Sequence, residues 1–123
     1  MVLNLKNEGG DKRGKILFFT HNNTKINLFE IKRGFARGGH YHPFNVVYIL
    51  LSGKVEYREF NIETNIETIK VLNAPTVINN MTHTANLITA INDSLFVEIF
   101  SHDYKAKIYP KYRKTIEEKL ESN

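Results

Sequence analysis

The chain of 123 residues has no cysteine and no long apolar run. Without cysteine it forms no disulfide, so a disulfide-stapled mini-protein is excluded, and no thiolate is available as a nucleophile. The longest apolar stretch, residues 46–51, falls far short of the roughly 20 residues that a membrane helix needs. The N-terminus lacks the basic region and apolar segment of a secretion signal. We therefore expect a cytoplasmic protein with no membrane partner.

Several sequence signatures of well-known sites are also missing. The chain has no Walker loop, no Gly-x-Gly-x-x-Gly and no nucleophile elbow of the Ser-His-Asp hydrolases. Its composition, 41% hydrophobic and 24% charged, is that of an ordinary globular protein. At this length we predict a single domain spanning residues 1–123.

The net charge of +4 is unevenly distributed along the chain. Residues 105–123 contain six basic and three acidic side chains, whereas the rest of the chain is nearly neutral. A nucleic-acid-binding protein usually carries a basic stripe across its folded body, so we predict no nucleic-acid partner. A run of charges of this kind usually forms a solvated helix face, although a basic surface also favours anionic ligands.

Short alternating or β-branched segments, separated by turn residues, dominate the first hundred residues. They predict an all-β sandwich or barrel with about eight strands. The expected strands are 15–20, 24–33, 45–51, 54–60, 66–72, 76–79, 84–91 and 94–100.

Only the C-terminal end has a helical pattern. Tyr112, Ile116 and Leu120 recur every four residues and form one narrow apolar stripe, and Pro110 precedes it as at a helix start. We expect a helix over about 111–121 that lies against the barrel or against a partner subunit.

Two histidines stand out because they are separated by one residue. Side chains alternate along a strand, so His40 and His42 are expected on the same face. His83 follows about forty residues later, and a barrel could bring it close to them. Three imidazoles could hold a divalent metal, two could form a catalytic pair, and two half-exposed strand histidines are the simplest alternative.

The spacing around these histidines resembles the first motif of the cupins, which are small jelly-roll barrels. The chain matches that motif with Gly34, with His40 after five intervening residues, with His42 after one more, and with the later Gly53. The segment 75–83 with Asn86 resembles the second cupin motif more loosely, and the similarity covers roughly residues 11–104. The resemblance implies a single-domain double-stranded β-helix, or jelly-roll barrel, with a short C-terminal helix.

Within the cupins, the chain looks most similar to enzymes that act on sugar nucleotides. These are the deoxysugar 3,4-ketoisomerases, the 3,5-epimerases and the cupin domain of capsular-sugar reductases. The segment from Arg37 to His42 matches the Arg-Gly-x-His-x-His motif of the ketoisomerases. The segments Asp11-Lys-Arg-Gly14 and 99–104 resemble the family's opening motif and its late strand and turn.

This resemblance implies an isomerase or epimerase that moves a proton on a nucleotide-linked keto sugar without a cofactor. His40 would be the base and His42 the proton shuttle, since the pKa of histidine lies near the operating pH. Arg37 would stabilise enolate or phosphate charge, and Tyr48 and Asn86 would contact the sugar. The partner would be an anionic sugar nucleotide, and the assembly a homodimer.

The sequence departs from the family at its metal site. Val46 occupies the position of the usual glutamate, so a metal would have only His40, His42 and His83 as ligands. One alternative is therefore a three-histidine centre for zinc, iron, manganese or nickel, either structural or dioxygenase-like. Another is a barrel that binds a carbohydrate or metabolite without turning it over.

Overall fold

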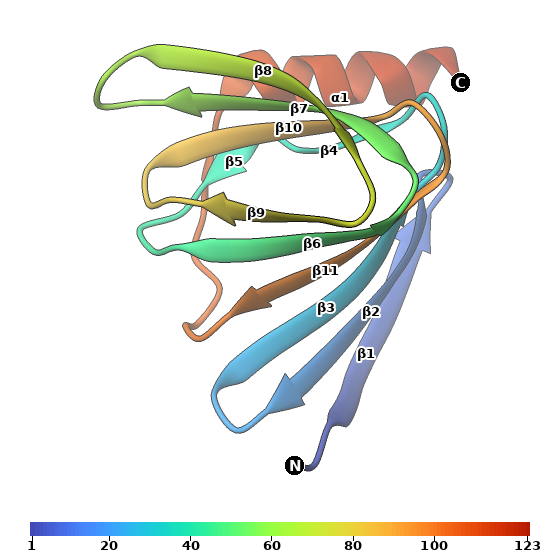
Figure 1. Ribbon diagram of the computed structural model, residues 1–123, viewed down its shortest axis with the longest axis vertical. Helices are drawn as coiled ribbons and strands as arrows, with labels where there is room; N and C mark the ends of the chain where they lie inside the picture. Colours follow the sequence, from blue (N-terminus) through green and yellow to red (C-terminus); the bar gives the residue numbers. More distant parts are fainter.

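The computed structural model describes residues 1–123, and its strands form two facing antiparallel sheets (Figure 1). The six-stranded sheet has the order β1 (Asn4–Asp11), β2 (Gly14–His21), β3 (Thr24–Ile31), β11 (Ser94–Phe100), β6 (Val46–Ser52) and β9 (Thr76–Asn80). The four-stranded sheet has the order β4 (Ala36–Gly38), β10 (Thr84–Ala90), β7 (Lys54–Asn61) and β8 (Ile66–Asn73). β5 (His40–Tyr41) pairs with β12 (Lys107–Ile108), and α1 (Pro110–Ser122) ends the chain.

The inner faces of the two sheets form the main core. Alternate residues of β3 and β6 point inward, among them Phe29, Ile31, Tyr48 and Leu50, and β11 adds Phe96. Phe29 and Phe96 stack with their ring centroids 5.2 Å apart. This period of two is the pattern that strands impose on a sheet with one buried face.

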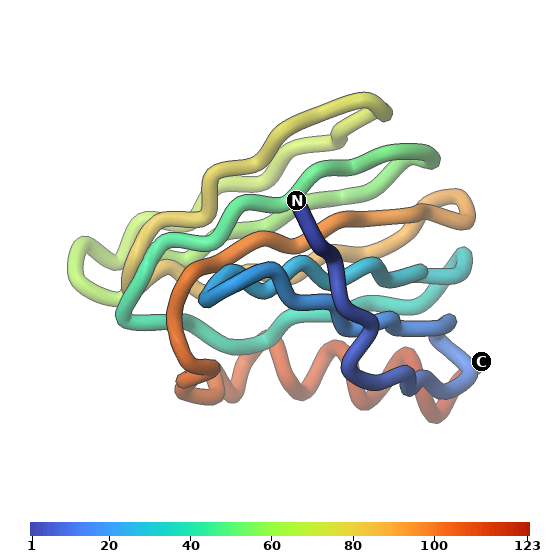
Figure 2. The backbone as a smooth tube through the Cα atoms, turned by 90° about the horizontal axis from the view of Figure 1, so that it is seen from below, coloured from blue at the N-terminus to red at the C-terminus, as the bar shows by residue number.

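The helix covers the outer face of the four-stranded sheet. Tyr112 and Ile116 are buried against Ala36, Ala85 and Leu87. Figure 2 shows the helix running alongside the barrel, with the C-terminus beside the turn that links β1 and β2. The predicted apolar stripe is thus used within the chain and is not available to a partner subunit. The helix does not have the length and apolar character that a membrane crossing requires.

All eight predicted strands are present, with ends within two residues of those expected. The sequence did not reveal β1, β4, β5 and β12, and the sheet therefore starts at Asn4 rather than near residue 11. β1 is polar, contains Gly9 and Gly10, and is exposed at every residue. Its strand conformation comes from pairing with β2 rather than from its own propensity.

The buried contact of α1 gives a testable expectation for stability. Ile116→Ala should lower the free energy of unfolding by about 3 kcal/mol, because it leaves a cavity beneath the helix. Urea denaturation measures this loss. The exposed neighbour Lys114→Ala should change stability by less than about 0.5 kcal/mol, and equal effects of the two variants would contradict the packing described.

Candidate functional site

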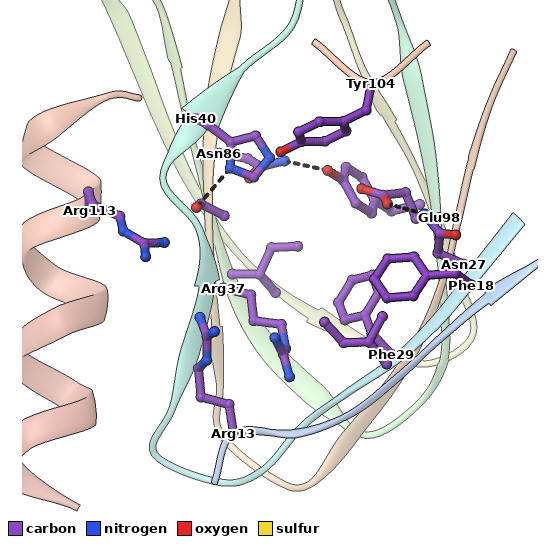
Figure 3. Close-up of a pocket in the computed structure, with 14 residues that line it drawn as sticks. Arg13, Phe18, Asn27, Phe29, Arg37, His40, Asn86, Glu98, Tyr104 and Arg113 are labelled. Atoms are coloured by element: carbon purple, nitrogen blue, oxygen red, sulfur yellow. Dashed lines mark hydrogen bonds between the residues drawn. The ribbon is translucent and has the colours of Figure 1, made fainter. Parts of the chain in front are cut away.

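A cavity of about 450 Å³ opens between the two sheets on the side of α1 (Figure 3). Most of its lining comes from inward-facing residues of β2, β3, β6, β10 and β11. The rest comes from the turn after β1, from β4 and β5, from the segment after β11 and from α1. The lining residues are Arg13, Ile16, Phe18, Asn27, Phe29, Arg37, Gly38, His40, Tyr48, Asn86, Ile88, Glu98, Tyr104 and Arg113.

Two glycines let the chain approach β10 and α1 closely just before His40. Both have positive φ, 107° at Gly38 and 76° at Gly39. A Cβ on Gly38 would lie 2.6 Å from the backbone oxygen of Asn86, and one on Gly39 would lie 3.1 Å from the backbone nitrogen of Arg113. Only glycine fits there, and this packing fixes where the His40 ring enters the cavity.

His40 is held as a neutral imidazole with one free nitrogen. Its Nδ1 lies 3.0 Å from the carbonyl oxygen of Gly38, which can only accept, so Nδ1 carries the proton. Nε2 has no protein partner and is not fully buried, which leaves its lone pair accessible at the cavity. Burial lowers the pKa of His40 to about 4, and nearby His42 and Arg113 act in the same direction.

His42 lies beside His40 but not in the cavity wall. The two ring centroids are 4.9 Å apart, so both side chains are on one side of the chain as expected. His42 is only 2% exposed, its Nδ1 donates to the carbonyl of Lys105 over 2.7 Å, and its ring stacks on Phe44. We expected it to reach the substrate, but β5 ends at Tyr41 and the chain turns away, so His42 packs behind His40.

The side chain of His83 is directed away from this pair, which corrects the three-histidine hypothesis, although its backbone amide donates to the carbonyl oxygen of His42 over 2.9 Å. Its Nδ1 lies 3.0 Å from Oε1 of Glu63, and it lines a separate, smaller cavity with Tyr41 and Lys105. Val46, at the position of the family's glutamate, is fully buried in the core. No group of three potential ligands converges anywhere in the chain, so the residues around His40 do not fit a metal centre.

A chain of polar side chains crosses the barrel at the inner end of the cavity. Asn86 Nδ2 donates to the hydroxyl of Tyr48 over 3.2 Å, and Asn27 Nδ2 donates to Glu98 Oε1 over 2.9 Å. Burial raises the pKa of Tyr48 well above its ordinary value, and the charge of Glu98 adds to this. Oδ1 of Asn86 is buried without a partner. Tyr48 and Asn86 thus line the cavity as predicted, and Glu98 is a carboxylate that the sequence did not single out.

The opposite end of the cavity is cationic. Arg37 is 8% exposed and donates from Nε and Nη2 to the backbone oxygens of Glu30 and Gly14, but it pairs with no carboxylate. Burial, and then the charge of Arg13, lower the pKa of Arg37 to about 10. Figure 3 shows Arg13 beside Arg37, with Arg113 reaching toward the cavity from α1.

Only one of these three arginines was predicted as a site residue. Arg13 lies in the Asp-x-Arg-Gly segment, whose resemblance to the family's opening motif could have identified it. Its side chain is held by Asp11 through three hydrogen bonds. No motif in the sequence indicated a role for Arg113, because we interpreted the charged residues around it as a solvated helix face. Its contact with the cavity depends on how α1 packs against Gly39.

Two groups of solved structures share this architecture at low sequence identity. The capsular polysaccharide assembling protein CapF from Staphylococcus aureus superposes with a TM-score of 0.73 at 16% identity, over 83% of this chain. An oxalate decarboxylase superposes with a TM-score of 0.72 at 19% identity, over 84% of this chain. The chain has the cupin fold.

The cupin fold confirms the jelly-roll barrel predicted from the sequence. The chain spans 31% of the CapF chain and 30% of the decarboxylase chain, so the likeness concerns one barrel of each longer protein. CapF has also been solved with the inhibitor 3-isopropenyl-tropolone, and the oxalate decarboxylase of Bacillus subtilis contains Mn(II) centres. No family model matches the chain, and no curated protein matches it.

The buried neutral state of His40 predicts a loss of stability in acid. The unfolded chain takes up a proton on this histidine near pH 6.5, whereas the folded cupin barrel resists it until about pH 4. Lowering the pH through this window therefore favours unfolding. Between pH 7 and 4.5 we expect the wild type to lose about 2 kcal/mol more than His40→Asn, measured by urea denaturation. Parallel losses in the two proteins would show that His40 is not the group responsible.

Proposed function

We propose that the chain is an isomerase or epimerase that transfers a proton on a nucleotide-linked keto sugar, with His40 as the base. The observation that carries this proposal is the accessible Nε2 lone pair of a neutral imidazole at a cavity rimmed by three arginines. The cavity volume of about 450 Å³ lies within the usual range for small-molecule sites.

The chemistry follows from the acidity of a C–H bond next to a carbonyl. Nε2 of His40 takes the proton from the carbon beside the ketone, and the electron pair of that bond forms an enolate. Return of the proton to the same carbon from the other side inverts a centre. Relocation of the ketone requires a hydroxyl on that carbon: the enolate oxygen gains a proton to give an enediol, the hydroxyl loses its proton to become the new carbonyl, and the proton held by His40 returns to the former carbonyl carbon. Both outcomes leave the oxidation level of the whole sugar unchanged, so the reaction balances without a co-reactant. A base within reach contributes about 10²–10⁴-fold to such a rate when its pKa lies near the operating pH. The pKa of about 4 keeps His40 neutral at pH 7 but makes it a weaker base than the sequence suggested.

Groups around His40 can stabilise the negative charge that builds up on the carbonyl oxygen. The Tyr104 ring lies 6.3 Å from the His40 ring, centroid to centroid. Partial desolvation and the charge of Glu98 raise the pKa of Tyr104, which keeps its hydroxyl protonated as a donor. Arg113 adds a positive charge on the same side of the cavity. Tyr104 therefore takes the role of proton donor in place of His42, which does not line the cavity.

The two ends of the cavity suit the two parts of a sugar nucleotide. At one end Arg13, Arg37 and Arg113 offer guanidinium groups that match phosphate oxygens, and Arg37 lacks any carboxylate partner. At the other end Glu98 and the amides of Asn27 and Asn86 provide donors and acceptors for sugar hydroxyls. The reaction includes no step through a metal, because His40 is the only imidazole that lines the cavity and no three potential ligands converge there.

Deuterium exchange tests the proposed reaction directly. Incubation of the protein with nucleotide-linked 4-keto sugars in deuterated buffer should place deuterium on the carbon next to the carbonyl, as seen by mass spectrometry and NMR. His40→Asn should reduce this exchange by at least about 100-fold, because the base is lost. The matched control His102→Asn alters an exposed histidine that stacks on Phe44 outside the cavity, and it should retain the wild-type rate.

Binding without exchange would identify a different function. If several nucleotide-linked keto sugars bind but none exchanges deuterium, the barrel is a binding module for a carbohydrate or metabolite and His40 is not a base. If His40→Asn exchanges as fast as the wild type, the assignment of His40 is wrong even though the activity is present.

The arginine end can be tested separately by binding. Arg113→Gln should raise the dissociation constant for a nucleoside diphosphate about 10-fold, since one charge-assisted contact to phosphate is lost. Isothermal titration calorimetry with uridine and thymidine diphosphates measures this change. Arg33→Gln, an exposed arginine outside the cavity, serves as the control of equal charge change. Equal affinities of the two variants would place the phosphates elsewhere.

A further inference from the structure

A second cavity, of about 240 Å³, lies across β5 from the main one. Side chains alternate along β5, so His40 lines the main cavity and Tyr41 lines the second. No residue of the second cavity takes part in the proposed reaction. The lining residues are Tyr41, Pro43, Ile62, His83, Lys105, Ala106 and Lys107.

The charged side chains that line this second cavity are all basic. Lys107 pairs with Tyr41 in the β5–β12 sheet, and directly opposed residues of an antiparallel pair have their side chains on the same face. Lys105, two residues earlier, lines the same cavity. Neither lysine belongs to an ion pair of the chain, and Glu63, which bonds His83, is not itself part of the lining. The cavity therefore presents two positive charges without a carboxylate partner.

His83 is held at this cavity in an uncommon backbone conformation. Its φ is 59°, in the left-handed region that residues other than glycine adopt rarely. Its amide donates to the carbonyl of His42 over 2.9 Å, and its carbonyl accepts from the amide of Ile62 over 3.2 Å. These two bonds hold the residue so that its imidazole lines the second cavity. Non-glycine residues in this conformation cluster at ligand sites, so the conformation is a second observation that points to a ligand.

We propose that the second cavity binds the phosphate group of a small ligand through Lys105 and Lys107. A phosphate carries a charge of about −1.5 to −2 at pH 7, which matches two lysines, whereas a carboxylate neutralises only one. Tyr41, Pro43 and Ile62 provide a largely apolar wall for the rest of such a ligand. The volume lies below the range of about 300 Å³ and more that drug-sized ligands need, which favours a small phosphate compound over a nucleotide.

One short segment of backbone joins the second cavity to the main one. Residues 101–106 have no regular secondary structure, and Figure 1 shows the chain after β11 passing beside β5 on its way to α1. Within this segment Tyr104 lines the main cavity and the next residue, Lys105, lines the second. The carbonyl of Lys105 accepts the bond from Nδ1 of His42, and the rings of His42 and Tyr104 lie 5.5 Å apart, centroid to centroid.

This connection makes the phosphate ligand an effector of the main cavity. A phosphate that bridges Lys105 and Lys107 fixes the backbone of the segment and, with it, the position of the Tyr104 ring. Tyr104 is the proton donor in the proposed reaction, so the effector role rests on the proposed function. The binding site itself does not, because it involves none of the reacting groups.

An NMR titration of the full chain with inorganic phosphate tests the site. The backbone amide signals of Ile62, His83 and Ala106 should shift with one dissociation constant, on the order of 1 mM. The double variant Lys105→Gln/Lys107→Gln should raise that constant at least about 10-fold, because two charge-assisted contacts are lost. Acetate at the same ionic strength should also bind at least about 10-fold more weakly than phosphate, because it carries a single charge.

Two control variants separate this site from other basic groups. Lys111→Gln/Lys114→Gln removes two exposed lysines of α1 that line neither cavity, and it should change the constant by less than about 2-fold, because salt screens distant charges. Arg113→Gln weakens any binding of phosphate at the arginine end and should leave the shifts of the second cavity unchanged. Circular dichroism verifies that each variant is folded.

Glycerol 3-phosphate distinguishes the two sources of a phosphate group. Tighter binding than that of inorganic phosphate assigns the site to an organic phosphate whose carbon chain contacts the wall formed by Tyr41 and Ile62. Equal affinities assign the site to the free ion.

The ring signals of Tyr104, in protein with labelled tyrosine, test the connection between the cavities. They should shift with phosphate in the wild type and in Arg113→Gln, with the constant of the second cavity, and stay in place in Lys105→Gln/Lys107→Gln. An unmoved Tyr104 ring beside shifting amides of the second cavity would refute the effector role.

Other outcomes would refute the site as a whole. One is the absence of shifts at the second cavity up to about 20 mM phosphate, roughly twenty times the expected constant. Another is a Lys105→Gln/Lys107→Gln variant that binds phosphate as tightly as the wild type. These results are independent of catalysis, since a protein that exchanges no deuterium would still bind phosphate at this site.

Discussion

The close approach of the Gly38-Gly39 segment to β10 and α1 is the constraint on which the site depends. A side chain at Gly38 would meet Asn86, and one at Gly39 would meet Ile116 and the first turn of the helix. The same backbone supplies the carbonyl that holds Nδ1 of His40. One local geometry therefore joins the four-stranded sheet to the helix, orients the imidazole and brings Arg113 to the rim of the cavity.

Burial and the neighbouring positive charges act in the same direction on the pKa values in this cavity. Desolvation by burial lowers the pKa of both His40 and Arg37, so His40 is neutral while Arg37 keeps its charge. Burial of an arginine without a carboxylate partner costs free energy, and an anionic ligand would compensate the charge of Arg37. The site combines a neutral base with an unpaired cation, and this combination favours an anionic ligand with an acidic C–H bond.

The outer faces of the two sheets differ in composition and in what covers them. The four-stranded sheet is covered by α1 through Tyr112 and Ile116, and its strand β7 is mostly polar on the outer side. The outer face of the six-stranded sheet is largely apolar in its middle strands, with Glu8, Lys15 and Glu30 at its margin, and no helix of the chain covers it. Its strand β2 has one side on this face and lines the cavity with the other through Ile16 and Phe18.

The sequence by itself determined the strands, the helix and the pairing of His40 with His42, because these follow from periodicities of two and 3.6 residues along the chain. Tertiary structure alone decided that the His83 side chain is directed away from them toward Glu63, that β1 joins the sheet, and that Glu98 and Arg113 line the cavity. These placements depend on contacts between residues distant in sequence and on the exact direction in which the chain leaves a strand. Local patterns carry no information about either.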